Sequence, residues 1–192
     1  MRRYAAALAV ALLAAGLAAC GAPPGISTAM RLATEARTSA QIAEDNRILV
    51  AFNRAVAGES GALFRDVSTD VYVARVMLTG AVKEPRMKAR AEEIARAVPG
   101  VAQVINELQV TDQGGIGTTA NDLVIEQKLG VKYAADSAVD GANFRVRAVN
   151  GAVYLFGRAY SQGELDKAIA LARETDGVRR VVNHVRVQPR GQ

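Results

Sequence analysis

The chain has 192 residues, half of them hydrophobic, and contains one histidine and one cysteine. This inventory argues against a histidine general base or a multi-histidine metal site, so we expect neither an enzyme nor a cofactor. The formal net charge is +5, and +3 without Arg2 and Arg3 at the amino terminus. This modest positive excess favours an anionic lipid or polymer as partner, but it is too small to indicate nucleic acid binding.

The amino terminus has the pattern of a bacterial lipoprotein signal peptide over residues 1–19. A short basic start precedes an apolar run at 5–18, which is shorter than the roughly 20 residues that span a bilayer. It ends in Leu17-Ala18-Ala19-Cys20, which resembles a lipobox and implies cleavage before Cys20 and acylation of its thiol. Because Gly21 follows, and not an aspartate, the resemblance implies the outer membrane. The alternative is an ordinary secretory peptide that leaves a free cysteine.

From residue 45 onward the chain is a gapless repeat with an offset of 77 residues. Between 45 and 110, 15 of 66 aligned positions are identical, mostly at apolar positions and glycines, where a shared backbone imposes them. Two copies of one small domain are therefore predicted. The matching positions are Asp45 and Ile48 with Asp122 and Ile125, Val76-x-Leu78-x-Gly80 with Val153-x-Leu155-x-Gly157, Ala91, Ala95 and Arg96 with Ala168, Ala172 and Arg173, and Gly100-Val101-x-x-Val104-x-Asn106-x-x-x-Val110 with Gly177-Val178-x-x-Val181-x-Asn183-x-x-x-Val187.

In the first copy, the alanine-rich and charged stretch 28–56 predicts a helix that ends at the glycines of 58–61. Strands follow at 67–73 and 76–79, and Gly80 closes the second strand. Glu84-Pro85 begins another helix, since proline suits the first turn, and Pro99-Gly100 ends it. Residues 104–110 form the last strand. We expect a lipidated tether at 20–39, the first domain at 40–112 and a linker at 113–118.

The second domain, 119–192, repeats this order. A helix at 121–133 precedes a strand at 144–149, and Asn150-Gly151 forms a hairpin turn because both residues tolerate positive φ. A second strand ends at Gly157, Ser161-x-x-Glu164 begins the next helix as a capping box, and 181–187 is the last strand. Each copy is thus αββαβ, an α+β fold in which two helices cover one face of a three-stranded sheet.

The repeated motifs have a known counterpart. Asp-x-x-Ile on the first helix, Val-x-Leu-x-Gly on a strand and Gly-Val-x-x-Val-x-Asn-x-x-x-Val at the end resemble the BON domain. A lipobox followed by two such domains resembles the DolP-like (YraP-like) outer-membrane lipoproteins, which are similar in domain content to OsmY. The resemblance implies binding of anionic phospholipid through the first helix of the second domain, a role in envelope integrity under osmotic stress, and no catalysis.

Several repeated residues have a structural explanation. Gly80 and Gly157 are interpreted as bends after strands, and Gly100 and Gly177 as helix stops. Asn106 and Asn183 are expected to satisfy local backbone groups, and His184 to be an exposed strand residue.

The two copies differ on the outward face of their first helix. With Ile125 and Leu129 inward, the second copy turns three apolar side chains outward beside two lysines, whereas the first copy turns mainly polar residues outward. The predicted phospholipid-binding residues are Leu123, Val124, Gln127, Lys128, Val131 and Lys132.

Exposed apolar side chains beside lysines suit an interfacial helix, because the apolar groups enter the acyl boundary while the ammonium groups meet lipid phosphates. One alternative is that the apolar residues pack against the first copy or the linker. Another is that this face docks on a protein partner in an envelope assembly.

Overall fold

The structure is a computed structural model that describes residues 35–60, 67–111 and 120–190. The expected signal peptide, the lipidation site at Cys20 and the linker at 113–118 lie outside the described residues. From Glu35 onward the chain forms one compact unit. None of the helices in the described ranges has both the length and the apolarity needed to cross a membrane.

The first copy folds in the predicted order, with a later start of the first helix and one strand divided. The strand β2 pairs antiparallel with β1 and parallel with both β3 and β4, and the constant register makes β3 and β4 two pieces of one interrupted third strand. The predicted strand at 104–110 is therefore divided. The first helix begins only at Ser39, and it ends at Ser60, within the predicted break at 58–61. The elements are α2 (Ser39–Ser60), β1 (Val67–Tyr72), β2 (Arg75–Val82), α3 (Pro85–Ala97), β3 (Gln103–Asn106) and β4 (Gln109–Val110).

The second copy has the same topology with a continuous third strand, and the strand order is β5-β6-β7. Asn150 and Gly151 have φ of 51° and 74°, as a type I′ hairpin turn requires. Half of the expected capping box is present: Ser161 Oγ accepts from Glu164 N, but the Glu164 carboxylate accepts from Tyr160 and Asp140. The elements are α4 (Ala120–Ala135), the 3-10 turn η1 (Gly141–Asn143), β5 (Phe144–Val149), β6 (Ala152–Ala159), α5 (Gln162–Arg173) and β7 (Arg180–Val187).

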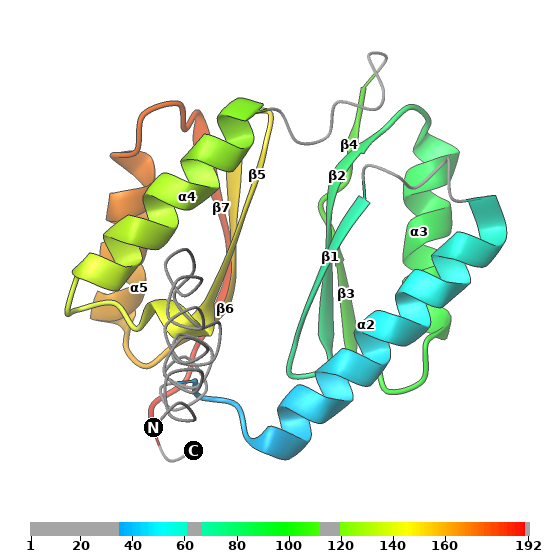
Figure 1. Ribbon diagram of the computed structural model, residues 1–192, viewed down its shortest axis with the longest axis horizontal. Coiled ribbons are helices and arrows are strands. Elements are labelled where there is room, and N and C mark those ends of the chain that lie inside the picture. The colour runs from blue at the N-terminus through cyan, green and yellow to red at the C-terminus, as the bar shows by residue number, and fades with distance from the viewer. Residues whose placement is uncertain (1–34, 61–66, 112–119, 191–192) are drawn as a thin grey trace, which may run out of the picture. The chain divides into compact units, whose positions relative to one another are not determined.

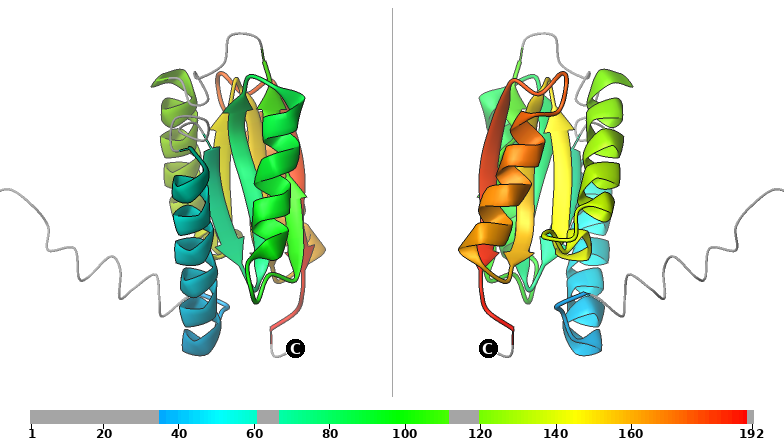
Figure 2. Two further views of the ribbon diagram at one scale, coloured as in Figure 1. Left: turned by 90° about the vertical axis from the view of Figure 1, so that its right-hand side faces the viewer. Right: turned by 90° about the vertical axis from the view of Figure 1, so that its left-hand side faces the viewer.

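Each copy has its own hydrophobic core between its sheet and its two helices. In the first copy Ile48 and Phe52 of α2 and Ala91 of α3 pack on Val76 and Leu78. The repeat-related residues of α4, α5 and β6 form the second core. Figure 2 shows each helix pair lying along its own sheet. The prediction of an α+β fold with two helices on one face of each sheet is confirmed.

The opposite, helix-free faces of the two sheets pack against each other and form a third core. Strand alternation places Val76 and Leu78 toward the helices and Met77 toward the other copy. The order through the unit is therefore two helices, a sheet, the second sheet and two helices (Figure 1). The residues of this third core are Tyr72, Met77, Ile105, Val149, Ala152, Tyr154 and Phe156, with Val182 at its edge.

The contact between the sheets is approximately two-fold symmetric. Arg147 donates to both carboxylate oxygens of Asp70, at 2.6 and 2.9 Å, and these residues are 77 positions apart. His184 Nε2 lies 2.7 Å from Glu107 Oε1, and this pair has the same separation. Residues at equivalent positions meet only beside an axis that exchanges the two copies. The tandem repeat thus packs as an internal pseudo-dimer.

The prediction that Gly80 and Gly157 close their strands is wrong, because both lie inside strands. Gly80 is within β2 and Gly157 within β6, and their φ values are 123° and 127°. A Cβ at Gly157 would lie 2.0 Å from the backbone oxygen of Asn143. The glycine permits the close approach of β6 to the backbone that precedes β5, a tertiary requirement that strand patterning does not reveal.

We expect Gly157→Ala to lower the free energy of unfolding by about 3 kcal/mol or more, because it combines a disfavoured φ with a backbone clash. Gly130→Ala is the matched control, since Gly130 is helical with open space around its Cβ position. This change should raise stability by about 0.5–1 kcal/mol. Urea unfolding of both variants tests the pair, and equal stability of the two variants would contradict the clash.

Candidate functional site

The helix α4 is positioned by four buried side chains on its inward face. Asp122, Ile125, Leu129 and Tyr133 are buried at intervals of three and four residues, and Tyr133 Oη donates to the Ala168 carbonyl of α5. This anchoring fixes which face of α4 meets solvent.

The outward face of α4 carries an exposed apolar patch. Leu123, Val124 and Val131 are 51%, 44% and 70% exposed. The first copy packs against the other face of the sheet and not against these residues, so packing against that copy does not explain them. This outward face of α4 is therefore the candidate functional site of the second copy.

A shallow groove of about 390 Å³ lies between α4 and the end of α5. Five of the six residues that the sequence predicts for phospholipid contact line it, and Leu123 lies outside. The lining residues are Val124, Gln127, Lys128, Val131, Lys132, Thr175 and Asp176.

The two lysines of the groove have different surroundings. Lys128 Nζ lies 3.4 Å from Asp176 Oδ2, and the Asp176 side chain is 95% exposed. Lys132 Nζ donates to the Leu171 and Glu174 carbonyls at 3.4 and 3.1 Å, where the negative end of α5 holds it. Lys128 can leave an exposed, weak ion pair for another anion. Lys132 has a structural role as well.

The first copy provides an internal comparison, because an equivalent groove lies between α2 and α3. Ala51 and Ala55 stand in it where the second copy has Lys128 and Lys132, and it also holds Arg90, which is paired with Glu59 and Glu93. The positions of α2 that match the apolar patch hold Asn46, Arg47 and Arg54, and the exposed Val50 matches Gln127 instead. The asymmetry predicted from the sequence is therefore present on the surface.

The repeated aspartates hold the hairpin turns, a role that the sequence pattern alone does not show. The Asp122 carboxylate accepts from the backbone N–H groups of Asn150 and Gly151, at 2.9 and 2.8 Å. Asp45 accepts equally from Val73 and Ala74, both at 2.8 Å. Both aspartates are almost fully buried. The sequence carries only an indirect signal for this role, since a polar residue is identical in both copies of a repeat whose other identities are mostly apolar residues and glycines.

The remaining repeated residues lie away from the groove. Gly100 and Gly177 follow α3 and α5 and lie against the first helix of their own copy. Asn106 Nδ2 donates to the Lys88 carbonyl, and Asn183 Oδ1 accepts from Val185 N. His184 lies in strand β7 as expected, but the expectation that it is exposed is wrong, since this side chain is partly buried between the sheets.

Comparison with known proteins agrees with this architecture. The family model described as "BON domain" matches residues 44–112 and 121–189. The chain belongs to the BON-domain family. Each match begins one residue before the buried aspartate of its copy, Asp45 or Asp122, and ends after the last strand of that copy.

Three relatives of this BON-domain protein are informative. The chain is 30% identical over 146 residues to an "Uncharacterized protein in gshII 5'region" of Anaplasma centrale, covering 76% of this chain and 95% of that one. It is 27% identical to "Osmotically-inducible protein Y" of Escherichia coli, covering 76% and 73%. It is also 27% identical to "Outer membrane lipoprotein DolP" of Haemophilus influenzae, covering 82% of each.

Proposed function

We propose that this BON-domain protein is a non-enzymatic lipoprotein of the outer membrane that faces the periplasm and supports envelope integrity. In this proposal Cys20 carries the lipid, and the outward face of α4 contacts anionic phospholipid. The similarity to an outer membrane lipoprotein and to an osmotically inducible protein supports an envelope location. The sequence Leu17-Ala18-Ala19-Cys20 supports the anchor.

The observation that carries the lipid contact is the exposed apolar patch on α4 beside Lys128. Leu123, Val124 and Val131 present apolar surface that can enter the acyl boundary, while an ammonium group can meet a lipid phosphate. No aromatic residue lies in the patch, so the grip on the bilayer should be weaker than that of a helix with tryptophan or phenylalanine. The lipid anchor would compensate by holding the domain at the surface.

We expect Leu123→Asp combined with Val124→Asp to lower cosedimentation with phosphatidylglycerol vesicles by about tenfold, since two charges replace apolar contacts at the interface. The measurement uses the chain from Gly21 onward, which contains the whole compact unit from Glu35. Wild type should bind phosphatidylcholine vesicles more weakly than phosphatidylglycerol vesicles.

The control is Val50→Asp on α2, the exposed apolar residue of the first copy's first helix, at 58%. It should change vesicle binding less than about twofold. Unchanged cosedimentation of the double variant would contradict the assignment of the site. A different result would favour a docking surface for an envelope protein. In that case wild type does not bind vesicles, and the double variant loses a protein partner that crosslinks to wild type in cells.

A further inference from the structure

A second candidate site lies at the edge of the contact between the two copies. A pocket of about 230 Å³ is lined there by four arginines, Arg37, Arg75, Arg158 and Arg186, together with Tyr72. None of its lining residues in the described ranges is an aspartate or a glutamate. It is separate from the groove on α4, which belongs to the opposite, helix-covered side of the second sheet.

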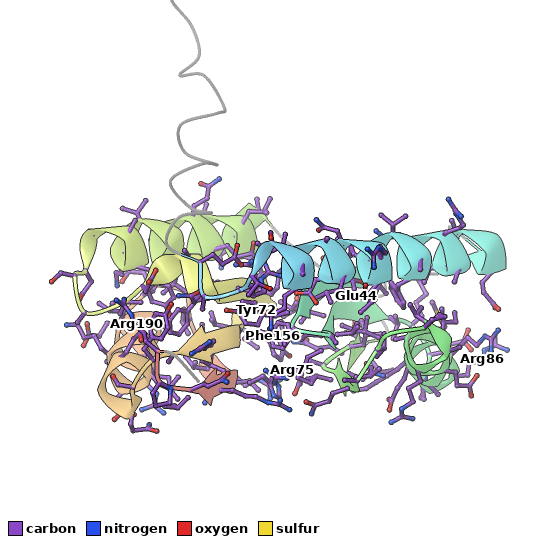
Figure 3. The ribbon with its side chains drawn as sticks, turned by 90° about the horizontal axis from the view of Figure 1, so that it is seen from below. Glu44, Tyr72, Arg75, Arg86, Phe156 and Arg190 are labelled. Carbon is purple, nitrogen blue, oxygen red and sulfur yellow. The ribbon has the colours of Figure 1, made fainter. Side chains whose placement is uncertain are left out.

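The fold brings three of these arginines together from both copies. Arg158 of β6 and Arg186 of β7 are register partners on neighbouring parallel strands. Strand alternation places both on the face that meets the first copy, together with Phe156. Arg75 begins β2 of the first copy, and its guanidinium lies 4.8 Å from the centre of the Phe156 ring. Figure 3 shows Arg75, Phe156 and Tyr72 gathered between the two copies.

The fourth arginine differs, because carboxylates of this chain already neutralise it. Arg37 bonds both Glu35 and Asp45, and its guanidinium lies 4.7 Å from the centre of the Tyr72 ring. Glu35 also bonds Arg145 at 2.8 Å. The positive charge of Arg37 is thus offset, and it forms a fixed wall of the pocket.

Arg75, Arg158 and Arg186 have only neutral acceptors among the described residues. Arg75 Nε and Arg186 Nη2 both donate to the same oxygen, Gln103 Oε1, at 3.1 and 2.7 Å. Arg75 also donates to the His184 carbonyl, and Arg158 donates to the carbonyls of Gln188 and Pro189. Two guanidinium groups that share one amide oxygen repel each other without a counter-charge.

The burial of Arg75 makes this arrangement costly. The residue is 6% exposed. Burial, and secondly the charge of Arg186, lower the pKa of Arg75 to about 10, so the guanidinium remains charged at neutral pH. A buried charge is normally paired with an opposite one. An anion in the pocket would supply the missing partner and would lie within reach of planar N–H donors that suit tetrahedral oxyanions.

We infer that the pocket between the two copies is a binding site for a small phosphate-class oxyanion, held by Arg75, Arg158 and Arg186. The volume accommodates a phosphate group and not a whole phospholipid. Free phosphate and the headgroup of a lipid share this chemistry. Because residues from both copies line the pocket, an occupying anion also stabilises their contact.

The test titrates the chain from Gly21 onward with inorganic phosphate at constant ionic strength, with chloride as reference, and follows the midpoint of thermal unfolding and the heat of binding. Wild type should show a saturable rise in the midpoint with phosphate. Arg158→Gln and Arg186→Gln, which leave the buried Arg75 in place, should each raise the Kd about fivefold or more. Arg173→Gln, an exposed arginine on α5, is the charge-matched control and should leave the Kd unchanged within about twofold.

The source of the phosphate group is distinguished with phosphatidylglycerol vesicles. If Arg186→Gln also lowers vesicle binding and phosphate competes with vesicles, the ligand is a headgroup. If vesicle binding is unchanged while the phosphate titration is lost, the ligand is a free anion. The site would be overturned if phosphate and chloride changed the unfolding midpoint of wild type equally. It would also be overturned if Arg158→Gln and Arg186→Gln bound phosphate with the Kd of wild type. The α4 double variant should titrate phosphate normally, so failure of one site does not imply failure of the other.

Discussion

Asp122→Ala should lower the free energy of unfolding by about 3 kcal/mol, although residue 122 lies on a helix and the groups it serves lie in a hairpin turn. Removing the carboxylate leaves the backbone N–H groups of Asn150 and Gly151 without their acceptor, and Gly151 is buried. A buried donor that loses its partner costs about 1–3 kcal/mol, and bonds to charged acceptors lie at the upper end of that range. Urea unfolding measures the difference.

The hairpin turn of the first copy leads to a related expectation for Asp45. Its turn consists of Val73 and Ala74, which have φ of 49° and 57° without the help of glycine or asparagine. Asp45 holds this strained turn and also pairs with Arg37. Asp45→Ala should therefore cost at least as much as Asp122→Ala. Asp166→Ala, on the exposed face of α5, is the control and should change stability by less than about 0.5 kcal/mol. Equal effects of all three variants would contradict the role of the buried aspartates.

The sequence predicts the architecture of each copy well, because the repeat samples one fold twice. Positions that are apolar in both copies are core positions, and the helices and strands follow from them. The predictions that are wrong concern tertiary contacts. Strand patterning puts Gly80 and Gly157 at strand ends, since a glycine in a strand pattern does not show whether another backbone approaches it. The capping-box pattern predicts that the carboxylate of Glu164 caps its own helix, but nearby N–H groups of Tyr160 and Asp140 compete for it.

The packing of the two copies has a weaker signal in the sequence. Strands that are buried on both faces read as continuous apolar runs, and β6 is such a strand, since Tyr154 and Phe156 alternate with Val153 and Leu155. The other sequence signal for this packing is that two repeat-related positions, Asp70 and Arg147, carry opposite charges. The exposed face of α4 was predictable because helical periodicity alone sorts inward from outward positions. The arginine pocket was not, because Arg75, Arg158 and Arg186 come from three strands of two copies.

The contact between copies changes the meaning of experiments on isolated domains. Residues 118–192 or 40–112 alone would expose a sheet face that is buried in the intact chain, including Tyr154 and Phe156 or Tyr72 and Met77. Exposed aromatic and apolar surface promotes self-association and adventitious binding to vesicles. Point variants in the intact unit are therefore the appropriate test of which copy binds lipid.

Arg147→Asp should lower the free energy of unfolding by about 3–5 kcal/mol, because it places a second carboxylate against Asp70 between the sheets. The Asp70 side chain is 8% exposed, and two hydrogen bonds from Arg147 satisfy its oxygens. The hydrogen bond to Asp70 also raises the pKa of Arg147, which reflects a favourable ion pair. The substitution leaves the buried Asp70 carboxylate facing a like charge, although the Arg147 side chain is itself 36% exposed. The measurement is urea unfolding of the intact unit.

The exchange variant, Asp70→Arg with Arg147→Asp, tests the pseudo-two-fold relation itself. Since the two positions are equivalent in the repeat, exchanging the residues restores the pair in the opposite direction, and the double-mutant cycle should give a coupling of about 2 kcal/mol or more. Recovery should be incomplete, because Glu126 lies near position 147 and would then face a carboxylate. The exposed pair Glu44 and Arg47 is the control, and its exchange should give a coupling below about 0.5 kcal/mol. Additive effects of the single variants at 70 and 147 would mean that the helix-free sheet faces do not meet in solution. The arginine pocket, which residues of both copies line, would then not form.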